Sequence, residues 1–150
     1  MAHLQRAGVA AAPMRAEAKL RLLAGEGVEG DRYLFGTGYY SNKPEAGRQV
    51  TLFEIETLEA LARDEGVHLG PHEHRRNITV RGVPLNHLVG LRFLIGSVLL
   101  EATRLSTPCL YLEKLTSKPV FKPLLHRSGL NCRILRSGEV RVGDSVRPAL

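Results

Sequence analysis

The apolar residues of this chain recur mostly at the spacing of short strands. Several segments alternate between apolar and polar residues, or form short apolar runs bounded by Gly, Pro and polar residues. The expected strands cover residues 4–12, 18–24, 48–52, 76–81, 91–96 and 97–105, with two or three more in 131–149. Gly96 and Ser97 lie between two of these strands and predict a hairpin turn.

One segment has helical spacing instead. The apolar residues of 55–62 recur three and four positions apart, and Gly66 supplies a stop. Thr51 and Glu54 fit a capping box, in which each side chain satisfies a backbone N–H of the other residue. Shorter helical pieces are expected at 84–88 and 110–126, where prolines interrupt the pattern.

Many short strands with one solid helix predict a mainly β fold, a closed or partly closed barrel with one longer helix and a few short ones. The length fits a single domain spanning residues 1–150. A Gly-rich and Tyr-rich stretch without clear period predicts an irregular loop over residues 27–48, placed at the mouth of a site. No G-x-G-x-x-G motif follows a strand, which argues against a dinucleotide-binding fold.

Composition narrows the class of protein. Hydrophobic residues make up 43% and charged residues 24%, which excludes a disordered chain. No stretch approaches the roughly 20 apolar residues that cross a bilayer, so we expect no membrane association. Two cysteines and a start that does not resemble a signal peptide predict a cytoplasmic protein with reduced thiols. The net charge of +6 suggests an anionic partner.

Cys109 is the first candidate for chemistry. It follows Pro108 and precedes an expected short helix, whose free N–H groups would stabilise a thiolate. Such a thiolate can act as a nucleophile, carry a persulfide or ligate a soft metal. The alternative is a buried cysteine that packs as a small apolar side chain. Cys132 shares a strand face with Ile134, and we expect it in the core.

Two further groups of polar residues are candidates for binding. Strand alternation would point Arg75 and Asn77 to one face and Arg76 to the other, and a guanidinium beside an amide can hold a phosphate or a heterocycle edge. The alternative is a charged strand edge. Asp31 and Arg32 lie in a glycine-framed loop, where they could bind a ligand or fix the loop.

A cluster of histidines lies in the segment HLGPHEHRRN. His68, His72 and His74 are close enough in sequence to suggest zinc, but Gly70 and Pro71 indicate a loop, and H-x-H alone is a weak signal. We therefore expect a solvated loop here.

The order of several motifs resembles the MOSC domain, named for the C-terminal part of molybdenum cofactor sulfurases. The resemblance covers about residues 5 to 148. It rests on GVEGDRY (27–33), RQVTL (48–52), RRNITV (75–80), GVPLNHLVG (82–90), IGSVLLEAT (95–103), PCLYLEKLT (108–116) and GEVRVGDSV (138–146).

The resemblance implies a mainly β fold and a link to molybdenum cofactor, molybdopterin with its metal, or to sulfur carried as a persulfide on a cysteine. Cys109 matches the family cysteine, which ligates molybdenum in cofactor-holding relatives; Arg75 and Asn77 match residues that help hold the pterin. Asp31, Arg32 and Arg48 lie in motifs of the same resemblance and are further candidates for cofactor binding. A sulfur donor or acceptor protein and a redox partner are the implied partners. Sulfur transfer and an oxidoreductase that reduces N-oxygenated substrates are both open at this point.

A different class of protein is the alternative: a small basic β-barrel that binds nucleic acid, or a partner protein, without catalysis. Aromatic residues make up only 5% of the chain and Trp is absent, whereas stacking on bases needs aromatic side chains on a strand face. Nucleic acid is therefore the weaker expectation.

Overall fold

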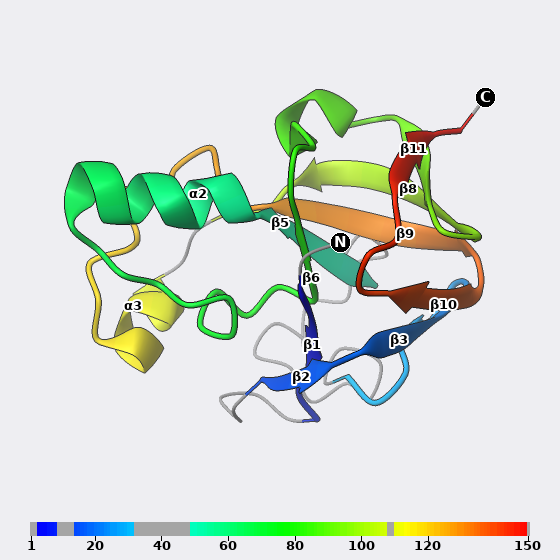
Figure 1. Ribbon diagram of the computed structural model, residues 1–150, viewed down its shortest axis with the longest axis horizontal. Coiled ribbons are helices and arrows are strands. Elements are labelled where there is room, and N and C mark those ends of the chain that lie inside the picture. The colour runs from blue at the N-terminus through cyan, green and yellow to red at the C-terminus, as the bar shows by residue number, and fades with distance from the viewer. Residues whose placement is uncertain (1–2, 9–13, 32–48, 108–109, 150) are drawn as a thin grey trace.

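The computed structural model describes residues 3–8, 14–31, 49–107 and 110–149 (Figure 1). Its strands are β1 (His3–Arg6), β2 (Arg15–Glu17), β3 (Lys19–Leu23), β4 (Gly27–Val28), β5 (Val50–Glu54), β6 (Ile78–Val80), β7 (Arg92–Ile95), β8 (Val98–Leu105), β9 (Leu130–Arg136), β10 (Gly138–Arg141) and β11 (Val146–Pro148). Its helical segments are α2 (Ile55–Ala60), a π-helical turn (Leu61–Glu65) that continues α2, a 3₁₀ turn (Leu85–Leu88) and α3 (Leu110–Thr116). The expected class, mainly β with one longer helix and short helical pieces, is confirmed.

The described strands form two sheets. The larger has eight strands in the order β11-β7-β8-β9-β5-β6-β1-β2, and the smaller has the order β10-β3-β4. The neighbours β5 and β6 run parallel and are connected through α2, whereas β5 runs antiparallel to β9. The larger sheet is not closed, which excludes the fully closed barrel. After β2 the chain leaves this sheet, because β3 pairs with β10 in the smaller one, and β2 and β11 remain as edges.

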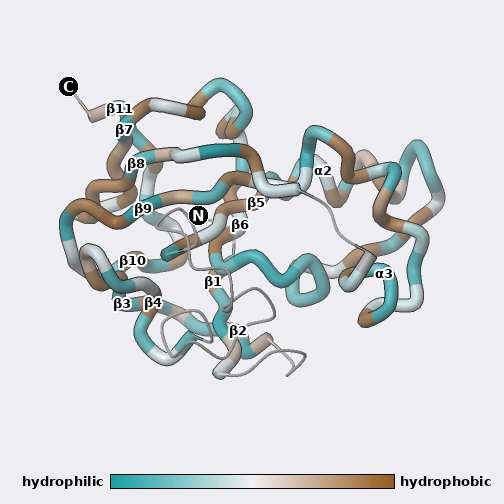
Figure 2. The backbone as a smooth tube through the Cα atoms, turned by 180° about the vertical axis from the view of Figure 1, so that it is seen from behind, coloured by the Kyte–Doolittle hydropathy of each residue, from teal (hydrophilic) through white to brown (hydrophobic). Residues whose placement is uncertain are grey.

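Apolar side chains of both sheets make the main core. The smaller sheet contributes Leu20, Leu22 and Val140, and the larger contributes residues such as Leu52 and Ile134, all at most 2% exposed. Viewed from behind, the apolar parts of the backbone follow these strands (Figure 2). The alternation along β3, where exposed and buried residues take turns, is the pattern expected of a strand with one face in a core.

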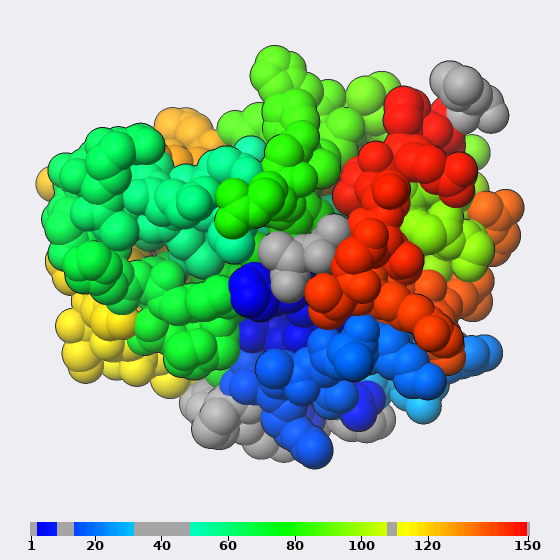
Figure 3. Space-filling model, viewed as in Figure 1, coloured from blue at the N-terminus to red at the C-terminus, as the bar shows by residue number. Residues whose placement is uncertain are grey.

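A second, smaller core lies on the other face of β5. Phe53 of β5, Leu61 and Leu124 are buried there together with Leu112 of α3. The helical segments α2 and α3 gather at one end of the molecule, beside the strands (Figures 1 and 3). As a result β5 is buried on both faces.

The boundaries of the long helix differ from the expected ones. Thr51 lies in β5 and bonds to Asn77, so the expected capping box is wrong. Glu54 takes the N-cap position with extended backbone angles and makes no side-chain cap bond. Gly66 ends the helical stretch in the left-handed conformation, with φ of 65°, as expected.

Other local expectations have mixed outcomes. The hairpin of β7 and β8 with its turn at Gly96 and Ser97 is confirmed. Gly27–Val28 pairs with β3 and is a short strand, so the loop expected over residues 27–48 is wrong at its start, and residues 32–48 lie outside the described ranges. No helix in the described part of the chain is long and apolar enough to cross a membrane.

Candidate functional site

The expected site residues fall into two groups. Cys109, Arg32 and Arg48 lie outside the described residues, and their roles stay predictions. Asp31, Arg75 and Asn77 are described. Arg75 and Asn77 precede β6, which begins at Ile78, so the strand alternation used to place them does not apply. Their positions are set by a loop instead.

Asn77 is the centre of a buried hydrogen-bond network and is 4% exposed. Its Oδ1 accepts bonds from the Thr51 backbone N–H and hydroxyl, both at 3.2 Å. Its Nδ2 donates to the Gln5 carbonyl at 3.2 Å and to Asp31 Oδ1 at 3.3 Å. Both the oxygen and the nitrogen of the amide thus have hydrogen-bond partners within the protein. To contact a ligand directly, Asn77 would have to give up one of these bonds.

Asp31 lies in the same network and is 1% exposed. Its Oδ1 accepts a second hydrogen bond, from the Ala7 backbone N–H at 3.2 Å. The structure therefore brings Asp31 and Asn77 together, although they are far apart in sequence. Through these two side chains the segments around β1, β5 and residue 31 are tied to the loop before β6.

His74 anchors the same loop from the other side. Its ring stacks on Phe53 with a centroid distance of 4.3 Å, and its Nε2 lies 2.9 Å from the Thr79 hydroxyl. Nδ1 accepts a hydrogen bond from the Arg76 backbone N–H at 2.9 Å, which leaves Nε2 as the protonated nitrogen. Burial, with smaller contributions from nearby positive groups, lowers the pKa of His74 well below its usual value, so the ring is neutral.

The buried state of His74 corrects the expectation of a solvated histidine loop at one of its three histidines. His74 is 1% exposed, whereas His68 and His72 are exposed as expected. No group of three or more His, Cys, Asp or Glu that could hold a metal exists among the described residues, so the zinc alternative finds no support there.

Arg75 lies between these anchored neighbours with a φ of 66°. The left-handed region is unfavourable for a residue with a side chain, by about 1–2 kcal/mol. Such a conformation persists when the surrounding structure fixes it, and it is common at binding sites. His74 and Asn77 provide the fixed ends, and Arg75 is half-buried between them.

Arg76 links this loop to the chain that leads into Cys109. Its Nε donates to the Ser128 carbonyl at 3.0 Å, and its Nη2 donates to the Thr107 carbonyl and the Ser128 hydroxyl, both at 3.3 Å. Arg76 therefore has the structural partners expected of it. Thr107 precedes Cys109 by two residues, so the loop of Arg75 lies beside the start of that segment.

Cys132 is confirmed in the core. It is a free thiol with no exposed surface, and burial raises the pKa of its thiol far above the usual value. A thiol of this kind is inert as a nucleophile near neutral pH.

Sequence reasoning missed Thr51, Gln5 and His74 as members of the network. A signal for Thr51 exists, because it is a polar residue inside the otherwise apolar run of β5. Polar residues that are buried in a strand need a hydrogen-bond partner. The partner itself, Asn77, is not visible from local spacing.

A separate cavity of about 450 Å³ lies at the helical end of the molecule. It is lined by Glu65, Val67, Glu113, Pro119, Phe121, Lys122 and Pro123. The carboxylate of Glu113 accepts a hydrogen bond from the Phe121 backbone N–H at 2.9 Å and so helps to shape the wall. Among the described candidates, neither Asp31 nor Arg75 nor Asn77 lines this cavity.

Comparisons with known proteins agree with the mainly β fold and with the family resemblance of the sequence. A family model described as MOSC domain matches residues 30–147. The crystal structure of the YuaD protein from Bacillus subtilis has a TM-score of 0.80 and 22% identity, covering 99% of this chain and 94% of that protein. No curated protein matches the chain in a sequence search.

Two structures of YiiM are also similar. YiiM from Geobacillus stearothermophilus has a TM-score of 0.71 and 14% identity, covering 92% of this chain and 64% of that protein. YiiM from Escherichia coli has a TM-score of 0.67 and 15% identity, covering 100% and 70%. At these identities the likeness shows the fold alone. The family model, in contrast, spans most of the sequence, and the chain therefore belongs to the MOSC domain family.

Proposed function

We propose that this MOSC domain carries sulfur on Cys109 and binds molybdenum cofactor beside it, with Arg75 contacting the cofactor's anionic group. The observation that carries the proposal is the contact from Arg76 to the Thr107 carbonyl. It holds the loop of Arg75 against the segment that continues into Cys109. A cationic loop that is held at Thr107, two residues before Cys109 in the sequence, would suit an anionic, sulfur-containing ligand.

The charges of the described residues fit such a ligand. Arg75 and Arg76 are adjacent cations in a half-buried loop. The nearby carboxylate of Glu73 is held by Lys118 Nζ at 2.7 and 2.9 Å, so its charge is balanced. Guanidinium groups make strong, charge-assisted hydrogen bonds to phosphate, and molybdopterin carries a phosphate. Arg75 therefore suits a phosphate in charge and in chemistry, whereas the Arg76 guanidinium adds positive charge and is bonded to Ser128 and Thr107.

Asn77 and Asp31 support the site in this proposal by fixing the loop. The four bonds of the Asn77 amide hold the residue after Arg76, and the buried His74 ring accepts a hydrogen bond from the Arg76 backbone N–H, so both neighbours of Arg75 are fixed. Arg75 is then presented in one conformation, which lowers the entropy lost when a ligand binds. Arg32 and Arg48 remain predicted contributors of positive charge.

The sulfur-transfer step needs only the Cys109 thiolate and a persulfide donor. The thiolate attacks the outer sulfur of the donor, a new S–S bond forms on Cys109, and the donor's S–S bond breaks to release a donor thiolate. No net oxidation or reduction takes place, since one persulfide replaces another. Nearby guanidinium groups favour the thiolate over the thiol. When bound, the cofactor would supply molybdenum-centred chemistry, including reduction of N-oxygenated substrates, with Cys109 as a thiolate ligand.

The first experiment tests sulfur carrying. The protein is treated with a low-molecular-weight persulfide, and the peptides are read by mass spectrometry under non-reducing conditions. We expect one added sulfur atom on Cys109 and none on Cys132, and Cys109→Ser should gain no sulfur. Persulfidation that is absent from Cys109, or equal on the two cysteines, would show that sulfur transfer is not its chemistry.

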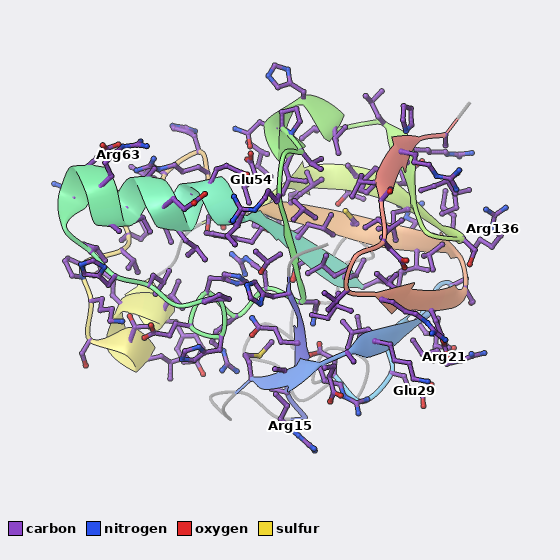
Figure 4. All side chains as sticks on the ribbon, viewed as in Figure 1. Arg15, Arg21, Glu29, Glu54, Arg63 and Arg136 are labelled. Carbon is purple, nitrogen blue, oxygen red and sulfur yellow. The ribbon has the colours of Figure 1, made fainter. Side chains whose placement is uncertain are left out.

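The second experiment tests cofactor binding. The protein is purified from a cofactor-producing host, and molybdenum and oxidised pterin are measured per chain. Arg75→Gln removes a charge-assisted interaction of about 1.5–3 kcal/mol. The affinity for the cofactor should therefore fall by roughly 10- to 150-fold, and the amount of cofactor that is retained per chain should fall with it. Arg63→Gln is a matched control, since Arg63 is an exposed arginine at the far end of the helical stretch (Figure 4). Equal retention in both variants would exclude Arg75 from the site.

A further inference from the structure

The outer face of the larger sheet carries an unusual concentration of arginine. Phe93, Ile95 and Leu100 point into the main core, so their neighbours on β7 and β8 point outward. Strand register places Arg147, Leu94, Leu99 and Arg136 in one row across β11, β7, β8 and β9. The next row holds Arg92, Glu101 and Arg133. Arg104 follows along β8, opposite Asn131 of β9. We call Arg92, Arg104, Arg133, Arg136 and Arg147, with Leu94, Leu99 and Glu101, the arginine face.

The charges of this face are poorly balanced. Glu101 bonds Arg92 at 3.1 Å and lies 3.8 Å from Arg133, so one carboxylate serves two guanidinium groups. Arg136 Nε donates to the Ser97 carbonyl at 3.0 Å, and Arg147 Nη2 donates to the Gly96 carbonyl at 3.1 Å. The four exposed arginines of the face, Arg92, Arg133, Arg136 and Arg147, against one glutamate leave a charge of +3 among these residues, in a chain whose net charge is +6.

The side chains are also accessible to a partner. Arg92, Arg133, Arg136 and Arg147 are exposed, and Figure 4 shows Arg136 projecting from the end of β9 away from the sheet. Both Arg136 and Arg147 bind carbonyls of the same β7–β8 turn, which brings two like charges toward one hairpin. Like charges on neighbouring strands destabilise a sheet. An acidic surface placed against this face would relieve that repulsion.

We propose that the arginine face is a docking surface for an acidic partner protein. Leu94 and Leu99, half-buried at its centre, give the face an apolar middle within a charged surround, the arrangement typical of protein interfaces. From strand spacing and rise, the backbone positions of the face span roughly 15 by 17 Å. This area is smaller than that of a stable protein interface and fits a transient complex that is guided by charge.

The face is continuous with the candidate site. β8 runs from the hairpin turn past Glu101 and Arg104 to Leu105, and Thr107, which accepts a hydrogen bond from Arg76, lies two residues further along the chain. A partner seated on the arginine face would therefore stand next to the segment that leads to Cys109. This position suits a protein that delivers sulfur or electrons and then leaves, but the docking proposal itself does not depend on the chemistry of Cys109.

The test uses the full chain and a labelled acidic helical peptide, with glutamates along one face, as the probe. Binding is followed by fluorescence anisotropy at several salt concentrations, with a single-stranded oligonucleotide of equal charge in parallel. The face variant carries Arg133→Gln, Arg136→Gln and Arg147→Gln. The control variant carries Arg15→Gln, Arg21→Gln and Arg63→Gln, and loses the same charge at three separate places (Figure 4).

We expect the face variant to bind the peptide about 10-fold more weakly and the control variant to stay within about twofold. A single Arg147→Gln exchange should weaken binding in the same direction, and Cys109→Ser should bind like the unmodified protein. If the face and control variants weaken peptide binding equally, the overall charge of the protein explains the effect and the proposal is overturned. A preference for the oligonucleotide that the face variant abolishes would overturn it as well, because the face would then be a nucleic-acid site.

Discussion

Removing the Asn77 side chain tests whether its amide belongs to the interior. Asn77→Ala deletes four hydrogen bonds of 3.2–3.3 Å and takes the side-chain partner from two buried backbone groups, the Thr51 N–H and the Gln5 carbonyl, whereas Asp31 keeps its bond from the Ala7 N–H. Each unsatisfied buried group costs about 1–3 kcal/mol, part of which water recovers when it enters the space. We therefore expect a loss of roughly 3–5 kcal/mol in the free energy of unfolding.

The assay is urea unfolding followed by far-UV circular dichroism, which suits a chain without Trp. Asn86→Ala is the matched control, because Asn86 is exposed and its amide donates a hydrogen bond to the His126 carbonyl at 2.8 Å. The control should lose less than about 1 kcal/mol. A second variant, Asn77→Asp, places a carboxylate beside Asp31, so its loss should be larger at pH 7 than at pH 4. If Asn77→Ala and Asn86→Ala cost the same, the amide is not held by the network and is available for a ligand.

Three further predictions concern the core and its charges. Gly129 has a φ of 105°, and an added Cβ would overlap the Leu52 carbonyl. Gly143 also has a positive φ, but nothing lies within 4 Å of a Cβ added there. In urea unfolding, Gly129→Ala should therefore lower the free energy of unfolding by at least about 2 kcal/mol more than Gly143→Ala. Burial and the charge of Glu56 raise the pKa of Glu54, so the ionised side chain destabilises the fold at neutral pH. Glu54→Gln should therefore raise the urea midpoint at pH 7 and leave it unchanged at pH 3. An unchanged midpoint at pH 7 would contradict this. The Cys132 thiol should resist iodoacetamide at pH 8 until urea unfolds the protein, and labelling of native Cys132 would show that it is not buried.

Local patterns in the sequence are sufficient for elements whose partners are close in the chain. The β7–β8 hairpin has its turn residues beside its strands, and Gly66 ends the helical stretch that it follows. Local spacing predicts a helix cap at Thr51, whereas Thr51 lies in β5 and bonds to Asn77, which is 26 residues away in the sequence. The capping-box rule reads only the nearest four residues, so it could not weigh this long-range bond.

The residues of the candidate site can be predicted from local motifs, but their conformation and burial cannot. Family motifs pointed to Asp31, Arg75 and Asn77, but the left-handed φ of Arg75 and the burial of His74 follow from contacts with other strands. The arginine face depends on the register of four strands, whose residues are spread over residues 92–147. A one-residue shift in any of these pairings would move its arginines to the opposite side.

The order of strands in the two sheets has a consequence for synthesis on the ribosome. β1 pairs with β6, and β3, with its buried Leu20 and Leu22, pairs with β10 near the end of the chain. At a translation rate of about 5–20 residues per second, β10 is synthesised roughly 6–25 s after β3. During that interval its apolar residues are not covered by their final partner. We expect nascent chains of this protein to bind chaperones that shield exposed apolar strands, and to be released only after the last three strands have been made.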